Sequence, residues 1–344
     1  MPFEIVPAGT QIDFLGKRQI CLVISVGLIA LGAIFAVVKG VNVGLDFAGG
    51  TEVQLLFDEG VAVDEEALRA LTNEKGFTSV QVVRFSDDVA VNEFVIKFLD
   101  VAEGSAAAGE VARLEAEAES DGESAIGLEA NTRVVVLESF IGQEIGGHTE
   151  QRVEYVGPRV GAELREDGAL ALLYSAIMIL IYVAFRFSAR FAPGAVVAVV
   201  HDLAITASIL VILGEEFDLR ILAAMLAILG YSLNDTIIIY DRIRENMELH
   251  TTADLEATLN TSVNQTLSRT VLTSVTTLLA LLSLFFLGGE VIQPFAKTML
   301  IGVLVGTYSS IFIASPLLLF LEQRYGDGGK PKTRKGPGVN KAVV

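Results

Sequence analysis

The sequence predicts a polytopic α-helical membrane protein, with six transmembrane helices and a small α+β domain outside the bilayer. Three observations predict this fold. The 344 residues are 52% hydrophobic, and their mean hydropathy of +0.55 is too high for a soluble domain. Several apolar runs are long enough to span a bilayer. The net charge of −17 arises in one segment, residues 40–164, which holds 25 acidic and 8 basic residues.

The first predicted span is Ile20–Val38, an apolar run of 19 residues that follows Lys17 and Arg18. A secretory signal peptide would have a shorter apolar region and a small-residue cleavage site. Residues 1–39 are therefore expected to be a cytoplasmic N-terminus and an uncleaved first helix. The acidic balance gives no support to nucleic-acid binding. The single cysteine, Cys21, lies inside the run, so no intrachain disulfide is possible.

Residues 40–168 are predicted to form a periplasmic α+β domain. Alternating apolar residues indicate strands, and Asp64 is the expected N-cap of the clearest helix. The order strand, helix, strand, strand favours a ferredoxin-like fold, and no cluster of metal ligands occurs in the segment. The predicted elements are strands at Thr51–Phe57, Ser79–Phe85, Val91–Leu99, Arg133–Ile141 and Arg152–Val156, a helix at Asp64–Lys75 and a turn at Ser86–Asp88.

An acidic insertion, Ala102–Gly127, interrupts this domain. It is rich in Ala, Glu, Gly and Ser and has almost no large apolar residues. Such a composition is typical of a solvated helix or a mobile segment. We therefore expect the insertion to offer no apolar face and to add nothing to a core.

Five further spans are predicted in residues 169–321, and their connections alternate in charge. Basic residues follow the second, fourth and sixth spans, whereas the other two connections are mostly acidic. Lys and Arg favour the cytoplasmic side, so both termini are expected inside a bacterial inner membrane, with residues 322–344 as a basic tail. The spans are Ala169–Phe185, Pro193–Leu213, Ile221–Tyr240, Thr266–Leu287 and Phe295–Leu321.

A carboxylate at membrane depth is expensive and is rarely without a function. Asp235 lies ~8 Å along its helix from the inner end near Tyr240, and Arg269 enters the next helix at a similar depth. Neighbouring antiparallel helices would bring the two into an ion pair. The pair would act either as a static brace or as a proton relay, and we predict the relay.

The third span adds His201 and Asp202, ~14 Å along the helix from Pro193. Both side chains are suited to proton relay, although a local helix contact is the alternative. On the sixth span, Gly302 and Gly306 form a small-residue face that is typical of close helix packing.

Six motifs together show a resemblance to a known family. The chain resembles the SecF family, the smaller subunits of the SecD–SecF accessory complex of the bacterial Sec translocon, within the RND superfamily. The resemblance places the family's proposed relay aspartate and arginine on Asp235 and Arg269. The motifs are Gly44–Thr51 (with Asp46, Gly49 and Gly50), Val156–Gly161, His201-Asp202, Gly230–Asp235 (with Asn234), Asp241–Asn246 (with Arg242 and Arg244) and Leu267–Thr270.

The resemblance implies half of an RND-type twelve-helix unit, in which proton flow moves periplasmic domains and so assists preprotein export. It implies a SecD-like partner, the SecYEG translocon, YajC- or YidC-type proteins, preprotein substrates and membrane lipid as partners. Protons would be the coupling ion, with no other cofactor and no enzymatic activity. A passive scaffold of the translocon and half of a small-molecule exporter remain alternatives. Asp202 and Asp235 would formally suit an intramembrane aspartyl protease, but the sequence Gly230–Asp235 does not fit that class of enzyme. Sodium in place of protons also stays open.

Overall fold

The structure, a computed structural model, describes residues 7, 10–85, 92–121, 128–187, 191–249, 254–289 and 291–325. The predicted turn at Ser86–Asp88 and nearly all of the basic tail lie outside these ranges. The chain divides into two compact units. One contains Met1–Asn42, Leu170–Glu215 and Arg220–Val344, and the other contains Val43–Ala169 and Glu216–Leu219.

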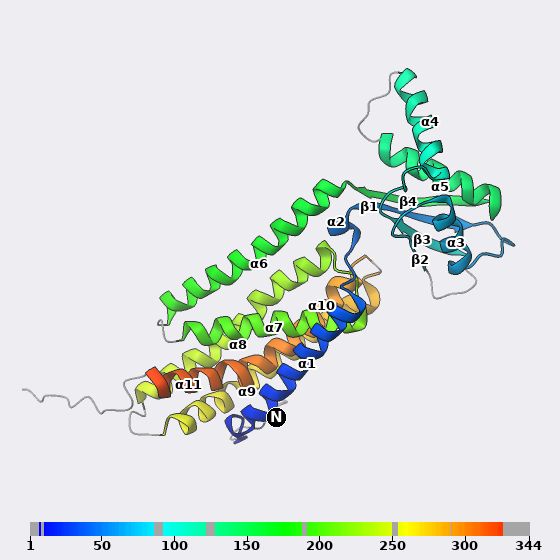
Figure 1. Ribbon diagram of the computed structural model, residues 1–344. Coiled ribbons are helices and arrows are strands. Elements are labelled where there is room, and N and C mark those ends of the chain that lie inside the picture. The colour runs from blue at the N-terminus through cyan, green and yellow to red at the C-terminus, as the bar shows by residue number, and fades with distance from the viewer. Residues whose placement is uncertain are drawn as a thin grey trace, which may run out of the picture. The chain divides into compact units, whose positions relative to one another are not determined.

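Six helices within the described residues are long and apolar enough to cross a membrane, as predicted (Figure 1). Several run past the apolar stretches that predicted them, because their polar ends are stabilised locally. Asp254, for example, accepts a hydrogen bond from the Ala257 N–H and caps its helix. The helices are α1 (Arg18–Lys39), α6 (Pro158–Arg186), α7 (Ala192–Leu213), α8 (Leu219–Leu249), α9 (Leu255–Leu287) and a last span made of α10 (Gln293–Ser309), a π-helical turn (Ser310–Ala314) and α11 (Ser315–Tyr325).

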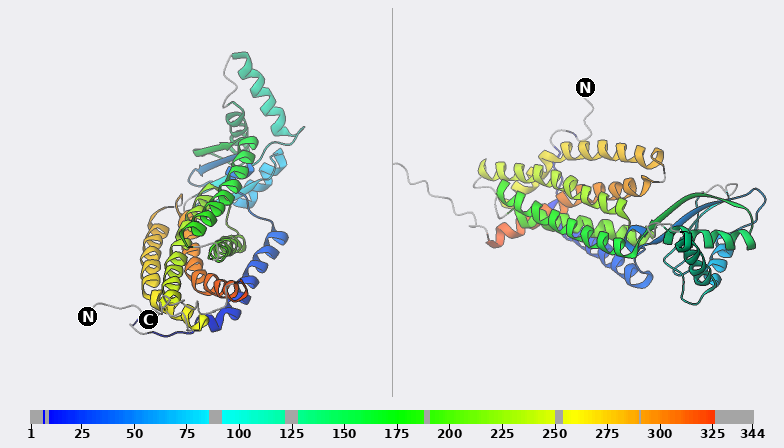
Figure 2. Two further views of the ribbon diagram at one scale, coloured as in Figure 1. Left: turned by 90° about the vertical axis from the view of Figure 1, so that its left-hand side faces the viewer. Right: turned by 90° about the horizontal axis from the view of Figure 1, so that it is seen from above.

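Burial separates the helices into an inner and an outer set. The apolar windows of α8 and the last span are 50% and 56% buried within the chain, against 11% for α1 and 17% for α9. Figure 2 shows α1 (blue) and α9 (yellow) on opposite sides of the bundle. Any intramembrane site must therefore be sought around α7, α8 and the last span.

Glycines allow these helices to pack closely. A Cβ on Gly302 of α10 would lie 2.1 Å from Cδ1 of Ile228 on α8. A Cβ on Gly32 of α1 would lie 2.3 Å from Cβ of Ser208 on α7. Small residues at such contacts are the usual means by which membrane helices approach each other. The small-residue face predicted on the sixth span is confirmed.

The second unit carries an antiparallel sheet in the order β2-β3-β1-β4, which confirms the ferredoxin-like prediction. Val53 at the centre of β1 pairs with Ile96 of β3 on one side and Val153 of β4 on the other. The predicted cap is also confirmed, since Asp64 accepts a hydrogen bond of 2.7 Å from the Ala67 N–H. The elements are β1 (Gly50–Phe57), α3 (Glu65–Lys75), β2 (Gln81–Arg84), β3 (Glu93–Phe98), α4 (Ala106–Asp121), α5 (Leu128–Glu144) and β4 (His148–Val156).

The strand predicted at Arg133–Ile141 is wrong, because this segment lies in the helix α5. Its β-branched residues favour a strand locally. However, Val134, Leu137 and Ile141 recur at helical spacing, and all three are buried against the sheet. Tertiary packing of that face outweighs the local preference.

The expectation that the acidic insertion lacks an apolar face is also wrong for its described part. Most of it forms the helix α4, in which Ala107 and Val111 are buried and Leu114 packs against the same core. These residues lie at positions i, i+4 and i+7, which is one face of a helix. A narrow apolar stripe is sufficient here, because neighbouring residues such as Ala112 and Arg113 are exposed.

We predict that Val111→Asp separates α4 from the core of the α+β unit and that Ala112→Asp does not. Val111 is 5% exposed, and an uncompensated buried charge costs about 3–5 kcal/mol. Ala112 is its exposed neighbour. Hydrogen exchange of the full chain should show faster exchange in α4 and α5 for the first variant only. Equal exchange rates in both variants would contradict the prediction and indicate that α4 does not pack against the core.

Candidate functional site

The Asp202 carboxylate on α7 is fully buried and is bonded from three helices. Nδ1 of the adjacent His201 lies 2.9 Å from its Oδ1. The Ser309 hydroxyl at the end of α10 donates to Oδ2 at 2.7 Å, and the Ser232 hydroxyl of α8 donates to the same oxygen. A buried carboxylate is tolerated when its lone pairs accept such bonds. The carboxylate therefore links α7, α8 and the last span.

The hydroxyl network continues into the π-helical turn that follows Ser309. The Thr236 and Ser310 hydroxyls lie 2.9 Å apart, and Ser310 also donates to the Gly306 carbonyl at 2.9 Å. In a π-turn the carbonyls lose their usual partners four residues ahead. The Ser315 hydroxyl instead donates to the Ser310 carbonyl at 3.0 Å. Isolated π-turns are frequent at functional sites.

Gly306 makes this convergence of helices possible. A Cβ at this position would lie 3.1 Å from Cβ and 3.3 Å from Cα of Ser232. Any larger side chain would push α10 away from α8. Ser309 would then lose its reach to the Asp202 carboxylate.

Asp235, one helical turn beyond Ser232 on α8, is in a different condition. Its side chain is 1% exposed, yet neither carboxylate oxygen has a hydrogen-bond partner in the part of the chain that the structure describes. Ser274 and Arg269 on α9 lie near it, but the Ser274 hydroxyl lies 2.7 Å from the Thr307 hydroxyl, and the Arg269 guanidinium forms no ion pair with the carboxylate. A buried charge in that state is costly, which favours the neutral acid or a rearrangement that brings a partner.

The predicted ion pair between Asp235 and Arg269 is therefore not formed in this arrangement. The buried face of α9 is a row of hydroxyl side chains four residues apart, Thr266, Thr270 and Ser274. Arg269 precedes Thr270 and is exposed, about 100° around the helix from that row. Rise per residue gave a similar depth for the two groups. It carried no information about the direction in which each side chain points.

Sequence reasoning missed Ser232 and Ser309 as partners of Asp202. Ser232 lies inside the Gly230–Asp235 motif without a role of its own, and Ser309 receives no role from the sequence pattern. The available signal was spacing. Ser232 and Thr236 are four residues apart on α8, on the same side as Asp235, and paired hydroxyls at that spacing beside an acid indicate a polar interior face.

The Gly44–Thr51 motif connects two segments of the α+β unit that are distant in sequence. Asp46 accepts a hydrogen bond of 2.9 Å from the N–H of Leu219, the first residue of α8. Gly49 and Gly50 have φ values of +75° and +120°, and a Cβ on Gly50 would lie 2.6 Å from the Phe98 carbonyl oxygen. Only glycine meets both conditions easily. These residues thus shape the backbone and lie apart from the buried carboxylates in sequence.

The Asp241–Asn246 motif ties the end of α8 to its surroundings. Arg242 Nε donates to Gln265 of α9 at 2.6 Å, and the buried Asn246 donates to Ser262 of α9 at 2.8 Å. These contacts hold the two helices together beyond the apolar region.

The remaining motif residues lie at surfaces of the described chain. Asp241 is 3.5 Å from Arg186 in an exposed ion pair, and Arg244 bonds to Glu248 on its own helix. Gly230 and Asn234 are exposed on α8, four residues apart, so they share one outward face.

The fold and the site define a polytopic membrane protein with ionisable side chains buried at membrane depth, a class in which such residues mark ion or substrate pathways. A model of the family described as "Protein export membrane protein SecD/SecF, C-terminal" matches residues 140–324. A second, the "SecD/SecF GG Motif", matches residues 34–61. The chain belongs to the SecD/SecF family of protein export membrane proteins, among the SecF protein translocase subunits.

Similar proteins cover nearly the whole chain. It is 38% identical over 330 residues to the protein translocase subunit SecF of Desulfurispirillum indicum, covering 95% of this chain and 96% of that protein. The subunit SecF of Pseudomonas aeruginosa is 40% identical over 314 residues, covering 90% and 91%. The crystal structure of SecDF from Thermus thermophilus, described as a translocon-associated membrane protein, matches with a TM-score of 0.74 and 36% identity. That match covers 93% of this chain and 40% of the SecDF chain. The chain is therefore a multi-pass protein of the inner membrane.

We predict that Gly306→Leu destabilises the isolated chain and Gly230→Leu does not. The first variant forces Ser232 and Ser309 apart, with an overpacking cost of about 1–3 kcal/mol and a lost bond to a charged group worth about 1.5–3 kcal/mol. At Gly230 a Cβ meets nothing within 4 Å. Thermal unfolding in detergent measures the difference. Equal melting temperatures would show that α8 and α10 do not depend on this contact.

Proposed function

We propose that the chain couples proton movement through α7, α8 and the last span to preprotein export, as one half of a SecD–SecF-type complex at the translocon. The observation that carries this proposal is the Asp235 carboxylate, which is buried and has no hydrogen-bond partner on either oxygen. It lies one turn from Ser232, which bonds to Asp202. On α8, the group proposed to bind a proton, Asp235, is thus adjacent to Ser232, which is held by its hydrogen bond to Asp202.

The energetics are compatible with a switch. When protonated, Asp235 is neutral and tolerates its present surroundings. When deprotonated, it attracts the nearest cation, and Arg269 lies off the buried face of the neighbouring helix. Rotation of α9 toward Asp235 would join the two charges, so proton binding biases two helix arrangements. One charge crossing 100 mV releases ~2.3 kcal/mol, enough to shift such an equilibrium substantially.

A partner half follows from the polar groups on the outer surface of the bundle. Asn234 and Arg269 are exposed on α8 and α9, and hydrocarbon is an unfavourable environment for both. A SecD-like subunit would cover them. The relative named SecDF from Thermus thermophilus, of which this match covers 39%, supports such an arrangement. Contacts with SecYEG, YajC- or YidC-type proteins and preproteins belong to the same proposal.

A static scaffold is the second candidate, and the Asp202 cluster favours it. His201, Ser232 and Ser309 all bond to this carboxylate, as expected of a group that fixes helix positions. The two functions are compatible if Asp202 holds the bundle and Asp235 titrates. The two candidate functions predict different effects of removing the Asp235 charge on export.

We predict that Asp235→Asn abolishes gradient-driven stimulation of export without loss of assembly. The substitution mimics the protonated acid and breaks no ion pair, because none is formed with Arg269. Abundance should therefore stay near normal. Export rates are to be measured in vesicles that contain both halves, with the proton gradient present or collapsed. Asp241→Asn on the same helix is the matched control, since its exposed ion pair is worth at most about 1 kcal/mol.

Two outcomes would contradict the proposal. If gradient-dependent export persists in the Asp235→Asn variant, Asp235 is not the coupling group, and the static scaffold becomes the better account of this chain. Stimulation by a sodium gradient alone, with protons equilibrated, would assign another coupling ion to the same carboxylate.

A further inference from the structure

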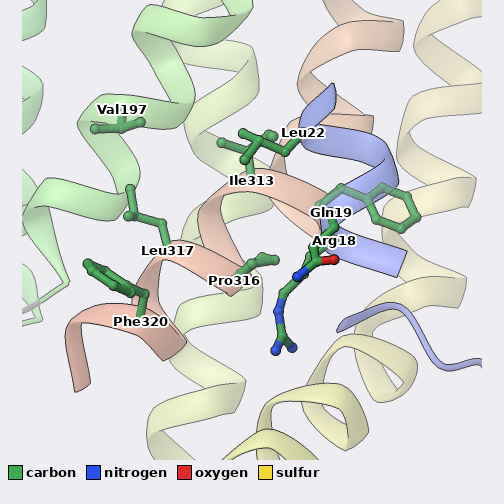
Figure 3. A pocket seen from close by; sticks show the side chains of 9 residues that line it. Arg18, Gln19, Leu22, Val197, Ile313, Pro316, Leu317 and Phe320 are labelled. Atoms are coloured by element: carbon green, nitrogen blue, oxygen red, sulfur yellow. The ribbon is translucent and has the colours of Figure 1, made fainter. Parts of the chain in front are cut away.

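A pocket of about 310 Å³ opens on the membrane unit between α1, α7 and the last span (Figure 3). Its walls are mostly apolar, and several of its side chains are exposed on the outer surface of the bundle. One end is polar, with Arg18 and Gln19 of α1. The apolar side chains include Leu22, Val197, Ile313 and Leu317.

The ends of two spans show which end of the pocket is nearer the membrane surface. Arg18 is the first residue of α1, and Phe320 lies five residues before Tyr325, where the last span ends. Leu22 is one turn further along α1, ~6 Å deeper. In Figure 3 the Arg18 guanidinium extends away from Leu22 and Ile313. The polar end is thus at the membrane surface, and the apolar end points into the bilayer.

Irregular helix geometry accounts for the pocket. The π-helical turn at Ser310–Ala314 places an extra residue in the last span, and Pro316, which lines the pocket, has no N–H to complete the next turn. Both features displace the helix from a regular path beside α1. Leu317 and Phe320 are carried to the pocket as a result.

The charge at the polar end matches an anion. Arg18 donates from Nη1 to the Leu15 carbonyl at 3.2 Å and to Glu256 Oε1 at 2.6 Å. Guanidinium carries five N–H donors, so Nε and Nη2 remain able to bind an oxyanion. The exposed Lys17 precedes Arg18 in the chain and adds a second cation at this end of α1. Basic pockets between membrane helices commonly bind anionic lipid headgroups.

We propose that this pocket is a binding site for one anionic phospholipid. The phosphate of the lipid lies against Arg18, and one acyl chain lies in the apolar groove between Leu22, Val197 and Leu317. The site does not depend on proton coupling. It would make the arrangement of α1 against the last span sensitive to lipid composition.

The absence of tryptophan from the sequence allows a local test. Phe320→Trp places a single fluorophore at the pocket, in the full chain reconstituted into vesicles. Phosphatidylglycerol with brominated acyl chains should quench it at a mole fraction about fivefold lower than brominated phosphatidylcholine does, the preference that one cationic side chain supplies near a membrane surface. A Phe286→Trp reporter on α9, 73% exposed and remote in sequence from the pocket-lining residues, should be quenched equally by both lipids.

Two charge variants, made with Phe320→Trp, separate lipid binding from the ion pair. Arg18→Gln and Glu256→Gln both remove the pair between these residues. Only the first should abolish the preference for phosphatidylglycerol, and the second should preserve or increase it. Equal quenching by the two lipids in the parent chain would overturn the proposal. Loss of the preference in both charge variants, or no quenching by either lipid, would also overturn it.

Discussion

The bundle depends on the sharing of one buried carboxylate by α7, α8 and the last span. A carboxylate removed from water must have its lone pairs satisfied, and Asp202 obtains its bonds from residues on all three helices. Hydroxyl side chains are short, so these bonds require the helices to approach closely. Gly306 supplies the space, and Ser309 lies at the end of α10, directly before the π-turn that begins at Ser310. The packing of the inner helices is therefore set by a polar contact as much as by apolar burial.

Asp202 and Asp235 show how two chemically identical groups can have different physical roles. Both are nearly inaccessible. One is held by several donors, so moving it would break bonds worth about 1.5–3 kcal/mol each. The other has no such bonds to lose. In the proposed function, the group without local partners changes protonation state while its neighbour keeps the helices in place.

Much of the fold followed from patterns that are local in the chain. Apolar runs marked all six spans, and alternation marked β1, β2, β3 and β4. The errors arose where a long-range contact decides the outcome. The valines of α5 favour a strand locally, but the segment forms a helix because one helical face packs against the sheet. In α4 only a few apolar residues contact the core, so the sequence pattern did not reveal this face. In the site, rise per residue gave positions along the helices for Asp235 and Arg269, but the exposed position of Arg269 depends on which face of α9 the neighbouring helices bury.

The π-helical turn has a consequence for the two halves of the last span. Five residues in place of four at one turn rotate everything that follows by about 100° around the axis. Gly302, Gly306 and Ser309 precede the turn and face the interior, whereas Leu317 and Phe320 follow it and line the outer pocket. In a regular α-helix of the same length, Leu317 and Phe320 would instead lie about 100° around the axis from their present positions. The single extra residue thus acts as a register shift that lets one helix present an interior polar face and an outer apolar face chosen independently of each other.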